Sequence, residues 1–346
     1  MKFLCYGDLH ATDGDEMSFT HPTQTLQHYR VEKFYSDLRA IYDKYQCNGV
    51  IDLGDTTGDR SSIPVPTIEV LGNGLDQIPD STWNIKLIGN HEQYLRDTSV
   101  NVRKLYNHKF NVISDMKVLD FDGWWAFFCS FPATNEALAQ QIAKQAIRLR
   151  NDGKILFGHF QIAGCQLSTG KALNGVPMDV LKHFELGLLG HIHLPQSLNE
   201  RIHYVGSPFQ QNWGEAGQQK RVAILDTASE PLQITWVALP GYPEYRQVSL
   251  AQFKALAKPE EEHRYKVILT SDAETEEYYR HPLCSRHPAV YSYDQVTAPE
   301  EKIQQDWSLE GVCQRWTQVL PPTQANIEVD PQELLDIGLA IATQKI

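Results

Sequence analysis

The sequence lacks the features of a secreted, membrane-bound or disulfide-stabilised protein. Its six cysteines are scattered over 346 residues and form no Cys-x-x-Cys pair, which argues against a thiolate metal site and favours reduced thiols. The apolar run near the N-terminus, Phe3 to Tyr6, is too short for a signal peptide, and no stretch approaches the length of a membrane span. We therefore expect a soluble chain in the cytoplasm, outside any membrane.

The chain is also poor in positive charge. It has 31 Lys and Arg against 43 Asp and Glu, which gives a net charge of −12. Such a chain is a poor generic binder of nucleic acid, because the phosphate backbone repels it. Binding of nucleic acid would require local basic patches or bound cations. Some of the acidic side chains can be metal ligands, whose charge a bound cation would neutralise.

Hydrophobic residues make up 42% of the chain, which is enough for a sizeable core. Short apolar runs that end at glycine alternate with runs in which apolar side chains recur at helical spacing. This alternation predicts an α/β fold. The expected helices cover residues 24–46 and 134–150. The expected strands cover residues 3–6, 50–53, 83–88, 118–121, 124–128, 155–157, 186–189, 222–225 and 234–238.

The stretch Leu-Pro-Gly-Tyr-Pro-Glu-Tyr at 239–245 is the best candidate for a domain boundary. We expect a first domain over residues 1–240 and a smaller, more acidic one over residues 241–346, which holds 10 Lys and Arg against 17 Asp and Glu. Its expected elements are strands over 265–269 and 289–293 and a final helix over 334–341. The apolar stripe of that helix either packs in a core or contacts a partner.

One pattern recurs five times along the chain: a short apolar strand, then glycine, then Asp, Asn or His. The five stretches read Tyr-Gly-Asp-Leu-His (6–10), Leu-Gly-Asp (53–55), Ile-Gly-Asn-His-Glu (88–92), Phe-Gly-His (157–159) and Leu-Gly-His-Ile-His (189–193). The carboxyl ends of strands in an α/β sheet converge on one crevice. Glycine permits the sharp exit and close backbone approach that such a crevice needs. The sequence therefore predicts that these polar side chains meet.

The residue types in these stretches are typical of metal ligands. Asp8 and His10 are two residues apart, as are His191 and His193, so in extended chain each pair points the same way. Carboxylate oxygens and imidazole nitrogens suit Mn²⁺, Fe²⁺ or Zn²⁺. A single Gly-Asp or Gly-His is usually a turn or a core residue, but five in order, each after a hydrophobic strand, are hard to produce by accident.

This series resembles the signature of the calcineurin-like metallophosphoesterase superfamily: DxH, GD, GNH(D/E), GH and GHxH. The match covers residues 1 to about 240. The resemblance implies a four-layer α/β/β/α sandwich and two divalent ions, Mn²⁺ above all, with Mg²⁺, Fe²⁺ or Zn²⁺ as alternatives. The implied ligands are Asp8, His10 and His193 for one ion, Asn90, His159 and His191 for the other, and Asp55 between them.

The resemblance also implies a catalytic residue. His91 follows a ligand directly and would sit near the leaving oxygen, where it donates a proton or a hydrogen bond. Glu92 is expected to orient it. The stretch Gly-Asp-Thr-Thr-Gly-Asp-Arg departs from the protein-phosphatase pattern, because Asp59 and Arg60 fall one position late. Their roles stay open between a solvated turn and a part of the site.

The segment Tyr-Val-Gly-Ser-Pro-Phe-Gln-Gln-Asn-Trp-Gly-Glu (204–215) resembles exonucleases of the SbcD type. This resemblance implies a two-metal DNA exonuclease in end processing, recombination or repair, with a C-terminal α+β capping domain. The implied partners are DNA and an SMC-like ATPase subunit, with a homodimer left open. The alternatives are a metal-dependent phosphatase or small-molecule phosphodiesterase, and a non-catalytic scaffold, which would usually have lost ligand positions.

Overall fold

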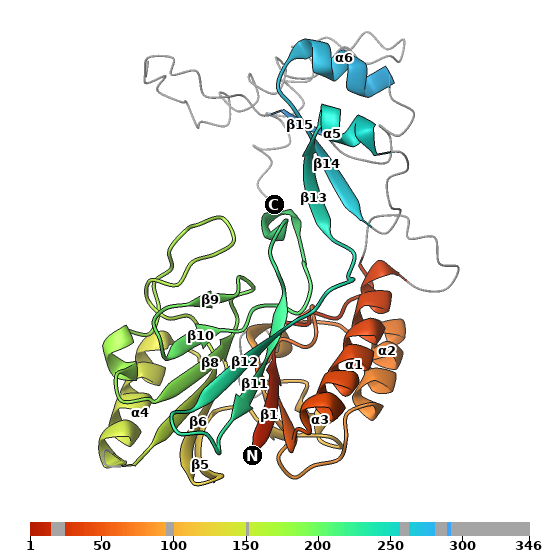
Figure 1. The fold of residues 1–346 in the computed structure, drawn as a ribbon. Helices are drawn as coiled ribbons and strands as arrows, with labels where there is room; N and C mark the ends of the chain where they lie inside the picture. Colours follow the sequence, from red (N-terminus) through yellow and green to blue (C-terminus); the bar gives the residue numbers. More distant parts are fainter. Residues whose placement is uncertain (15–24, 95–99, 150–151, 257–262, 281–288, 292–346) are drawn as a thin grey trace, which may run out of the picture. The chain divides into compact units, whose positions relative to one another are not determined.

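Two six-stranded β-sheets form the main body of the protein (Figure 1). The computed structural model describes residues 1–14, 25–94, 100–149, 152–256, 263–280 and 289–291, all within a unit that spans Met1–Ser292. The helix expected over 334–341 lies outside the described residues. The α/β fold class is confirmed, because helices alternate with the strands of both sheets.

The first sheet holds the strands of the N-terminal half and two later strands. Strands β1 to β4 run parallel to one another. Strand β11 pairs antiparallel with β1, and β12 pairs antiparallel with β11. The order across the sheet is β12 (Gln233–Ala238), β11 (Arg221–Asp226), β1 (Lys2–Tyr6), β2 (Gly49–Asp52), β3 (Ile85–Leu87), β4 (Asn111–Ile113).

The second sheet contains a hairpin that turns at Asp122-Gly123, in which Phe121 pairs with Trp124. Strands β6, β7, β8 and β10 run parallel, and the edge strands β5 and β9 are antiparallel to their neighbours. The order is β5 (Met116–Phe121), β6 (Trp124–Cys129), β7 (Lys154–His159), β8 (Leu186–Gly190), β10 (Ile202–Tyr204), β9 (Gln196–Ser197).

Alternation along the strands divides the core into clusters. In β1, Phe3 and Cys5 join the cluster shared by the two sheets, while Leu4 and Tyr6 join a cluster that includes helix residues, as the two-residue period of a strand requires. The shared cluster contains the stacked rings of Phe128 and Phe157, whose centroids are 5.0 Å apart. Burying one such side chain stabilises the fold by about 1.5–3 kcal/mol.

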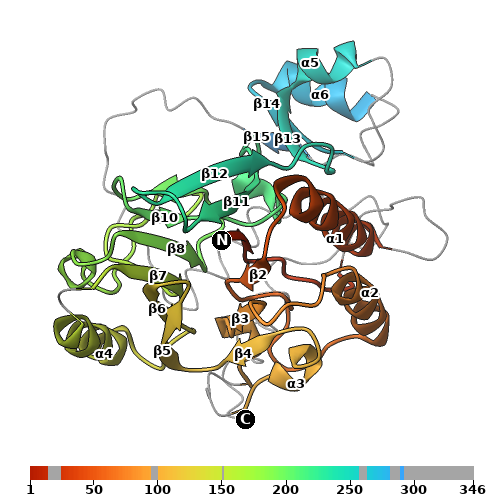
Figure 2. The ribbon, with the colours of Figure 1, turned by 60° about the horizontal axis from the view of Figure 1, so that its bottom comes forward.

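Helices cover the outer face of each sheet (Figure 2). Helix α1 (Leu26–Tyr45) is capped by Thr25, whose side chain accepts from the backbone N–H of His28. Helix α4 (Asn135–Arg148) begins after Thr134 and buries Leu138, Ile142 and Ala146 against the second sheet. Both helices match the expected ranges.

Two helices of this region were not expected from the sequence, α2 (Val65–Asp76) and the short α3 (Arg103–Tyr106). Two glycines interrupt α2, and glycine is a poor helix former. Gly74 is required by packing, because a Cβ there would lie 2.1 Å from the ring of Tyr35 on α1. The close approach of α1 and α2 therefore explains why glycine, a poor helix former, stands at position 74 within α2.

A third sheet, which has three strands, begins at the end of the candidate boundary at residues 239–245. Its parallel strands are β13 (Tyr245–Ser249), β14 (Arg264–Leu269) and β15 (Ala289–Tyr291), accompanied by helices α5 (Leu250–Ala255) and α6 (Asp272–Arg280). Phe253, Tyr265, Val267 and their neighbours form a separate hydrophobic cluster. Among the helices of the described residues, none has the length and apolar character needed to cross a membrane.

Candidate metal centre

The five Gly-containing stretches bring their polar side chains to the carboxyl ends of strands from both large sheets. Asp8 and His10 follow β1, Asp55 follows β2, Asn90 follows β3, His159 ends β7, and His191 and His193 follow β8. Asn90 and His91 lie in a 3₁₀ turn over Asn90–Glu92. The predicted convergence of these stretches is thus present in the structure, while the assignment of metal ligands stays a prediction.

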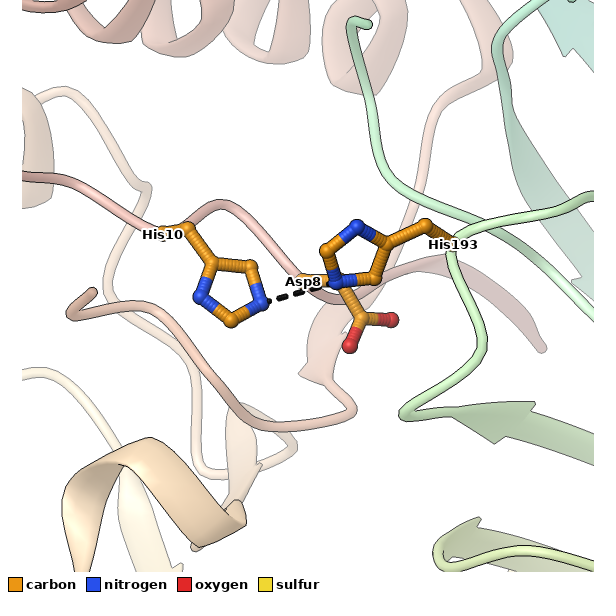
Figure 3. A group of neighbouring side chains, drawn as sticks. All are labelled: Asp8, His10 and His193. Atoms are coloured by element: carbon orange, nitrogen blue, oxygen red, sulfur yellow. Dashed lines mark hydrogen bonds between the residues drawn. The ribbon is translucent and has the colours of Figure 1, made fainter. Parts of the chain in front are cut away.

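A first group consists of Asp8, His10 and His193, each of which offers a ligand atom within 4.8 Å of the others. The Nε2 atoms of His10 and His193 are 3.0 Å apart. Figure 3 shows the two rings turned toward each other, with the carboxylate of Asp8 beside them. The backbone N–H of His191 donates to that carboxylate at 2.8 Å, which fixes its orientation.

A second group consists of Asp55, His159 and His191, again within 4.8 Å of one another. Asp55 Oδ2 lies 3.2 Å from His159 Nε2 and 3.7 Å from His10 Nε2. One carboxylate oxygen therefore faces a member of each group. The bridging role of Asp55 itself stays a prediction.

Asn90 provides a test of whether the second group suits a cation. Its side-chain oxygen lies 2.8 Å from His191 Nδ1, 3.3 Å from His159 Nε2 and 3.2 Å from Asp55 Oδ2. With the amide oxygen turned inward, four atoms that can each present a lone pair face one another, an arrangement that a cation among them would favour. With the amide turned the other way, its nitrogen donates to the other three atoms and its oxygen accepts from Arg60 Nη2. The nitrogen and oxygen donor set, without a thiolate, fits a divalent metal ion.

Hydrogen bonds at the far side of two rings set their tautomers. His159 Nδ1 donates to the carbonyl oxygen of Leu53 at 2.7 Å, and His193 Nδ1 donates to the carboxylate of Glu215 at 2.9 Å. In the neutral form of both rings the Nε2 lone pair then points to the centre. Such outer partners are typical of histidines that bind metal.

Burial and mutual charge shift the pKa values of the centre strongly. Burial raises the pKa of Asp8 to about 6 and lowers the pKa of His191 to about 3. Burial also lowers the pKa of His159, but the carboxylate of Asp55 outweighs it and raises that pKa to about 9. The pKa of Asp55, raised by burial, is held well below its usual range by His159. The negative charge of the Asp55 carboxylate therefore stabilises positively charged groups in this pocket.

The backbone of the centre is strained at several candidate residues. Asp8, His10, Asp55 and His191 have φ values of 57°, 49°, 55° and 81°, in the left-handed region that costs a non-glycine residue about 1–3 kcal/mol. Gly89 packs so closely that a Cβ there would lie 2.1 Å from Asp55 Oδ1. Strain of this kind is concentrated at functional sites, where surrounding contacts maintain it.

His91 forms a third, overlapping group with His10 and Asp55, whose possible ligand atoms also lie within 4.8 Å of one another. Its backbone N–H donates to Asp55 Oδ1 at 2.7 Å, and its ring centroid is 4.6 Å from that of His10. The ring Nδ1 donates to the carbonyl oxygen of Gly58 at 2.5 Å. The carbonyl of Gly58 holds the ring, and Nε2 is the nitrogen that remains for a substrate.

Glu92 has a different place from the one expected. Its carboxylate accepts from the backbone N–H groups of Gly89, Asp55 and Thr56 at 3.0, 3.2 and 3.2 Å. It also pairs with the fully buried ammonium of Lys86 at 2.9 Å. Glu92 thus joins the two loops that follow β2 and β3. A lysine inside an apolar strand, Asn-Ile-Lys-Leu-Ile, was the sequence signal for this network.

Arg60 is a second residue whose place the sequence left open. Its Nη2 lies 2.9 Å from the side-chain amide of Asn90. The guanidinium therefore reaches the edge of the candidate centre, although the residue falls one position late in the motif. Asp59 is exposed, which agrees with a solvated turn.

Similarity to a known protein family covers the part of the chain that holds the candidate ligands. The family model described as calcineurin-like phosphoesterase matches residues 1–195. A curated relative, the SbcD component of the nuclease SbcCD from Staphylococcus epidermidis, is 32% identical over 107 residues. That alignment covers 29% of this chain and 28% of the relative, so the chain matches less than a third of the relative's length.

Solved structures with a loosely similar chain trace include three of low sequence identity. They are a putative 5'-nucleotidase from Staphylococcus aureus (15% identity, TM-score 0.40, covering 68% of this chain and 52% of that one), a dimetal phosphatase from Danio rerio (11%, 0.44, 69% and 99%) and GAP50 of Plasmodium (10%, 0.41, 69% and 85%). These likenesses concern the path of the chain and not its activity.

Proposed function

Because the chain belongs to the calcineurin-like phosphoesterase family, we propose that it is a two-metal phosphodiesterase that removes nucleotides from DNA ends. Membership of the family indicates a metal-dependent hydrolase of phosphoesters. The observation that carries the proposal is the meeting of the two side-chain groups around Asp55. A non-catalytic scaffold is disfavoured, since every predicted ligand position and His91 are filled.

The proposed ligands are those that the sequence predicts. Asp8, His10 and His193 would hold one ion, Asn90, His159 and His191 the other, and Asp55 both. Two divalent ions in such a site act as Lewis acids and lower the pKa of water. We propose Mn²⁺ as the metal, with Mg²⁺, Fe²⁺ and Zn²⁺ as alternatives, because the donors are oxygen and imidazole nitrogen.

His91 and Arg60 are proposed to act on the substrate. Since Nδ1 of His91 donates to Gly58, Nε2 of the doubly protonated ring is the atom that can pass a proton to the leaving oxygen, a contribution of about 10²–10⁴-fold in rate. The guanidinium of Arg60, which lies beside Asn90, can bind phosphoryl oxygens through charge-assisted hydrogen bonds.

DNA as the substrate is the finer part of the proposal. Its support is the similarity to the SbcD component from Staphylococcus epidermidis and the segment 204–215, which resembles the same type of exonuclease. We propose with it the four-layer sandwich, a boundary near residue 240, a C-terminal capping domain and an SMC-like ATPase partner. The separate hydrophobic cluster after β12 supports a second domain.

A second candidate function is a phosphatase or small-molecule phosphodiesterase. The proximity of Arg60 to Asn90 favours it, since the protein-phosphatase branch uses an arginine to bind phosphate. The two candidates differ in their substrate. A phosphatase would act on phosphomonoesters or nucleotides and leave DNA ends intact.

Incubation with linear double- and single-stranded DNA and Mn²⁺ tests the proposal, with His91→Ala as the variant. We expect wild type to shorten DNA from its ends. The variant should retain two Mn²⁺ by metal analysis and lose about 10²–10⁴-fold in rate. Undegraded DNA together with rapid hydrolysis of a phosphomonoester would instead establish the second candidate. Equal rates in both proteins would remove the role given to His91.

A further inference from the structure

Glu215 is a buried carboxylate that the proposed reaction does not use. It ends a 3₁₀ turn over Trp213–Glu215, and its side chain is 1% exposed. Its position in the chain is 22 residues after His193, beyond β9 and β10. Burying an ionised carboxylate is costly unless it is paired and hydrogen-bonded, so the contacts of Glu215 indicate why it is there.

Both oxygens of this carboxylate are fully engaged. Oε1 accepts from His193 Nδ1 at 2.9 Å and from Asn212 Nδ2 at 3.0 Å. Oε2 accepts from Lys220 Nζ at 2.6 Å, and from Ser207 Oγ and the backbone N–H of Gln211 at 3.1 Å each. Five donors leave the carboxylate no freedom to turn, and the ring of His193 is held by a fixed partner.

Lys220 makes this buried charge tolerable and adds a second restraint. Its ammonium is 4% exposed and pairs with Glu215, which offsets the cost of burial. The same ammonium donates to the backbone carbonyl of His193 at 3.0 Å and to Ser207 Oγ at 2.8 Å. The main chain and the ring of His193 are thus fixed by one ion pair.

The same segment also reaches the other end of the first group. Gln211 Nε2 donates to the carbonyl oxygens of Asp8 and Leu9 at 3.2 and 3.1 Å. Residues 207–220 therefore contact two of the three members of the first group. His159, in the second group, is instead oriented by the carbonyl of Leu53.

We propose that Glu215 is a positioning residue that commits His193 to the Nδ1–H tautomer, so that its Nε2 lone pair faces the ion shared with Asp8 and His10. The inference rests on the proposed metal centre. It states that Glu215 supports the ion site of Asp8, His10 and His193 and not the other ion site. A hydrogen bond from histidine to a carboxylate fixes the ring and increases the basicity of the ligand nitrogen. His10 Nε2 lies 3.0 Å from His193 Nε2, so both nitrogens could bind one ion placed beside them.

Glu215→Gln is the test variant, because it preserves shape and removes the charge. Calorimetric titration of the full chain with Mn²⁺, after removal of metal by a chelator, should resolve two binding events in wild type. In the variant one of them should weaken about 10- to 100-fold, and the other should stay within about twofold. Equal weakening of both events, or of neither, would overturn the proposal.

Nitrogen NMR of the histidine rings in the metal-free full chain, at a pH at which the rings are neutral, supplies a readout that loss of packing alone would not move; an ion bound to Nε2 would itself fix the tautomer. We expect His193 to be an Nδ1–H tautomer in wild type and a mixture in Glu215→Gln. Glu215→Asp, which retains the carboxylate, should recover part of the tautomer preference and of the Mn²⁺ affinity. An unchanged tautomer in Glu215→Gln would refute the role.

One further variant serves as a control. Glu69→Gln makes the same chemical change at an exposed position of α2 and should change nothing. If wild type itself binds no Mn²⁺, the proposed function fails. If wild type binds two ions and Glu215→Gln binds them equally well, only the positioning role fails.

Discussion

Lys86 offers the sharpest test of the network beneath the candidate centre. Its ammonium is 0% exposed and lies 2.9 Å from both Asp52 and Glu92, 2.6 Å from Thr56 Oγ1, and over the ring of Tyr106 at 4.4 Å from the centroid. Lys86→Met removes the charge and leaves two carboxylates buried without their partner. Breaking a buried ion pair in this way costs about 3–5 kcal/mol.

Urea unfolding followed by circular dichroism measures this loss. With a slope near 3 kcal/mol per molar urea, the unfolding midpoint should fall by about 1–2 M. The double variant Lys86→Met, Asp52→Asn should lose less free energy of unfolding than the two single variants together, because the second substitution removes an unpaired charge. Additivity of the singles within about 0.5 kcal/mol would refute the coupling, as would a loss in Lys86→Met below about 1 kcal/mol.

The pH dependence of this contribution follows from the pKa of Lys86. Burial lowers that pKa, but the carboxylates of Asp52 and Glu92 raise it above its ordinary value. A raised pKa means that the stabilisation is complete below the ordinary lysine pKa of about 10.4 and is lost as pH rises through the folded-state value. The difference in unfolding free energy between wild type and Lys86→Met should therefore be constant from neutral pH to about pH 10.

Two other predictions concern the metal ions and the substrate. Mn²⁺ at about 100 times its Kd should raise the free energy of unfolding by about 2.7 kcal/mol per site. Urea titrations with Mn²⁺ and with EDTA measure this gain, and the Asp55→Asn variant should lose most of it. An equal gain in the variant would contradict the shared role of Asp55. Arg60→Ala should raise KM for a phosphoester about 10- to 100-fold at unchanged Mn²⁺ affinity by calorimetry, whereas weakened metal binding would mean a structural role.

The sequence predicted the strand ends of the centre because the signal there is local. An apolar strand that ends in Gly-Asp or Gly-His specifies a sharp exit, and the parallel pairing of β1 with β2 then brings Asp8 and Asp55 together. That His191 joins them from β8 of the second sheet did not follow from this local signal. The strands over 50–53 and 186–189 and the helix over 24–46 lie within a few residues of β2, β8 and α1. Such elements follow from the periodicity of apolar side chains alone.

The local sequence pattern does not predict the contacts that complete the site. Glu215 meets His193 only because a loop returns to the crevice after β10, and Lys86 meets Glu92 only because β3 lies beside β2. Arg60 reaches Asn90 through a turn one residue longer than the expected motif. Partners of this kind depend on long-range packing. The boundary near residue 240 stays a prediction.

Both candidate groups take side chains from the two sheets at once. Asp8, His10 and Asp55 follow strands of the first sheet, and His159 and His193 belong to the second, while the faces between the sheets meet through apolar side chains. A bound cation would therefore connect the two sheets at one end of an otherwise apolar interface. Thermodynamic linkage makes the effect mutual: a smaller side chain at Phe121, which is far along the chain from every candidate ligand, would leave a cavity between the sheets and weaken binding of the ions.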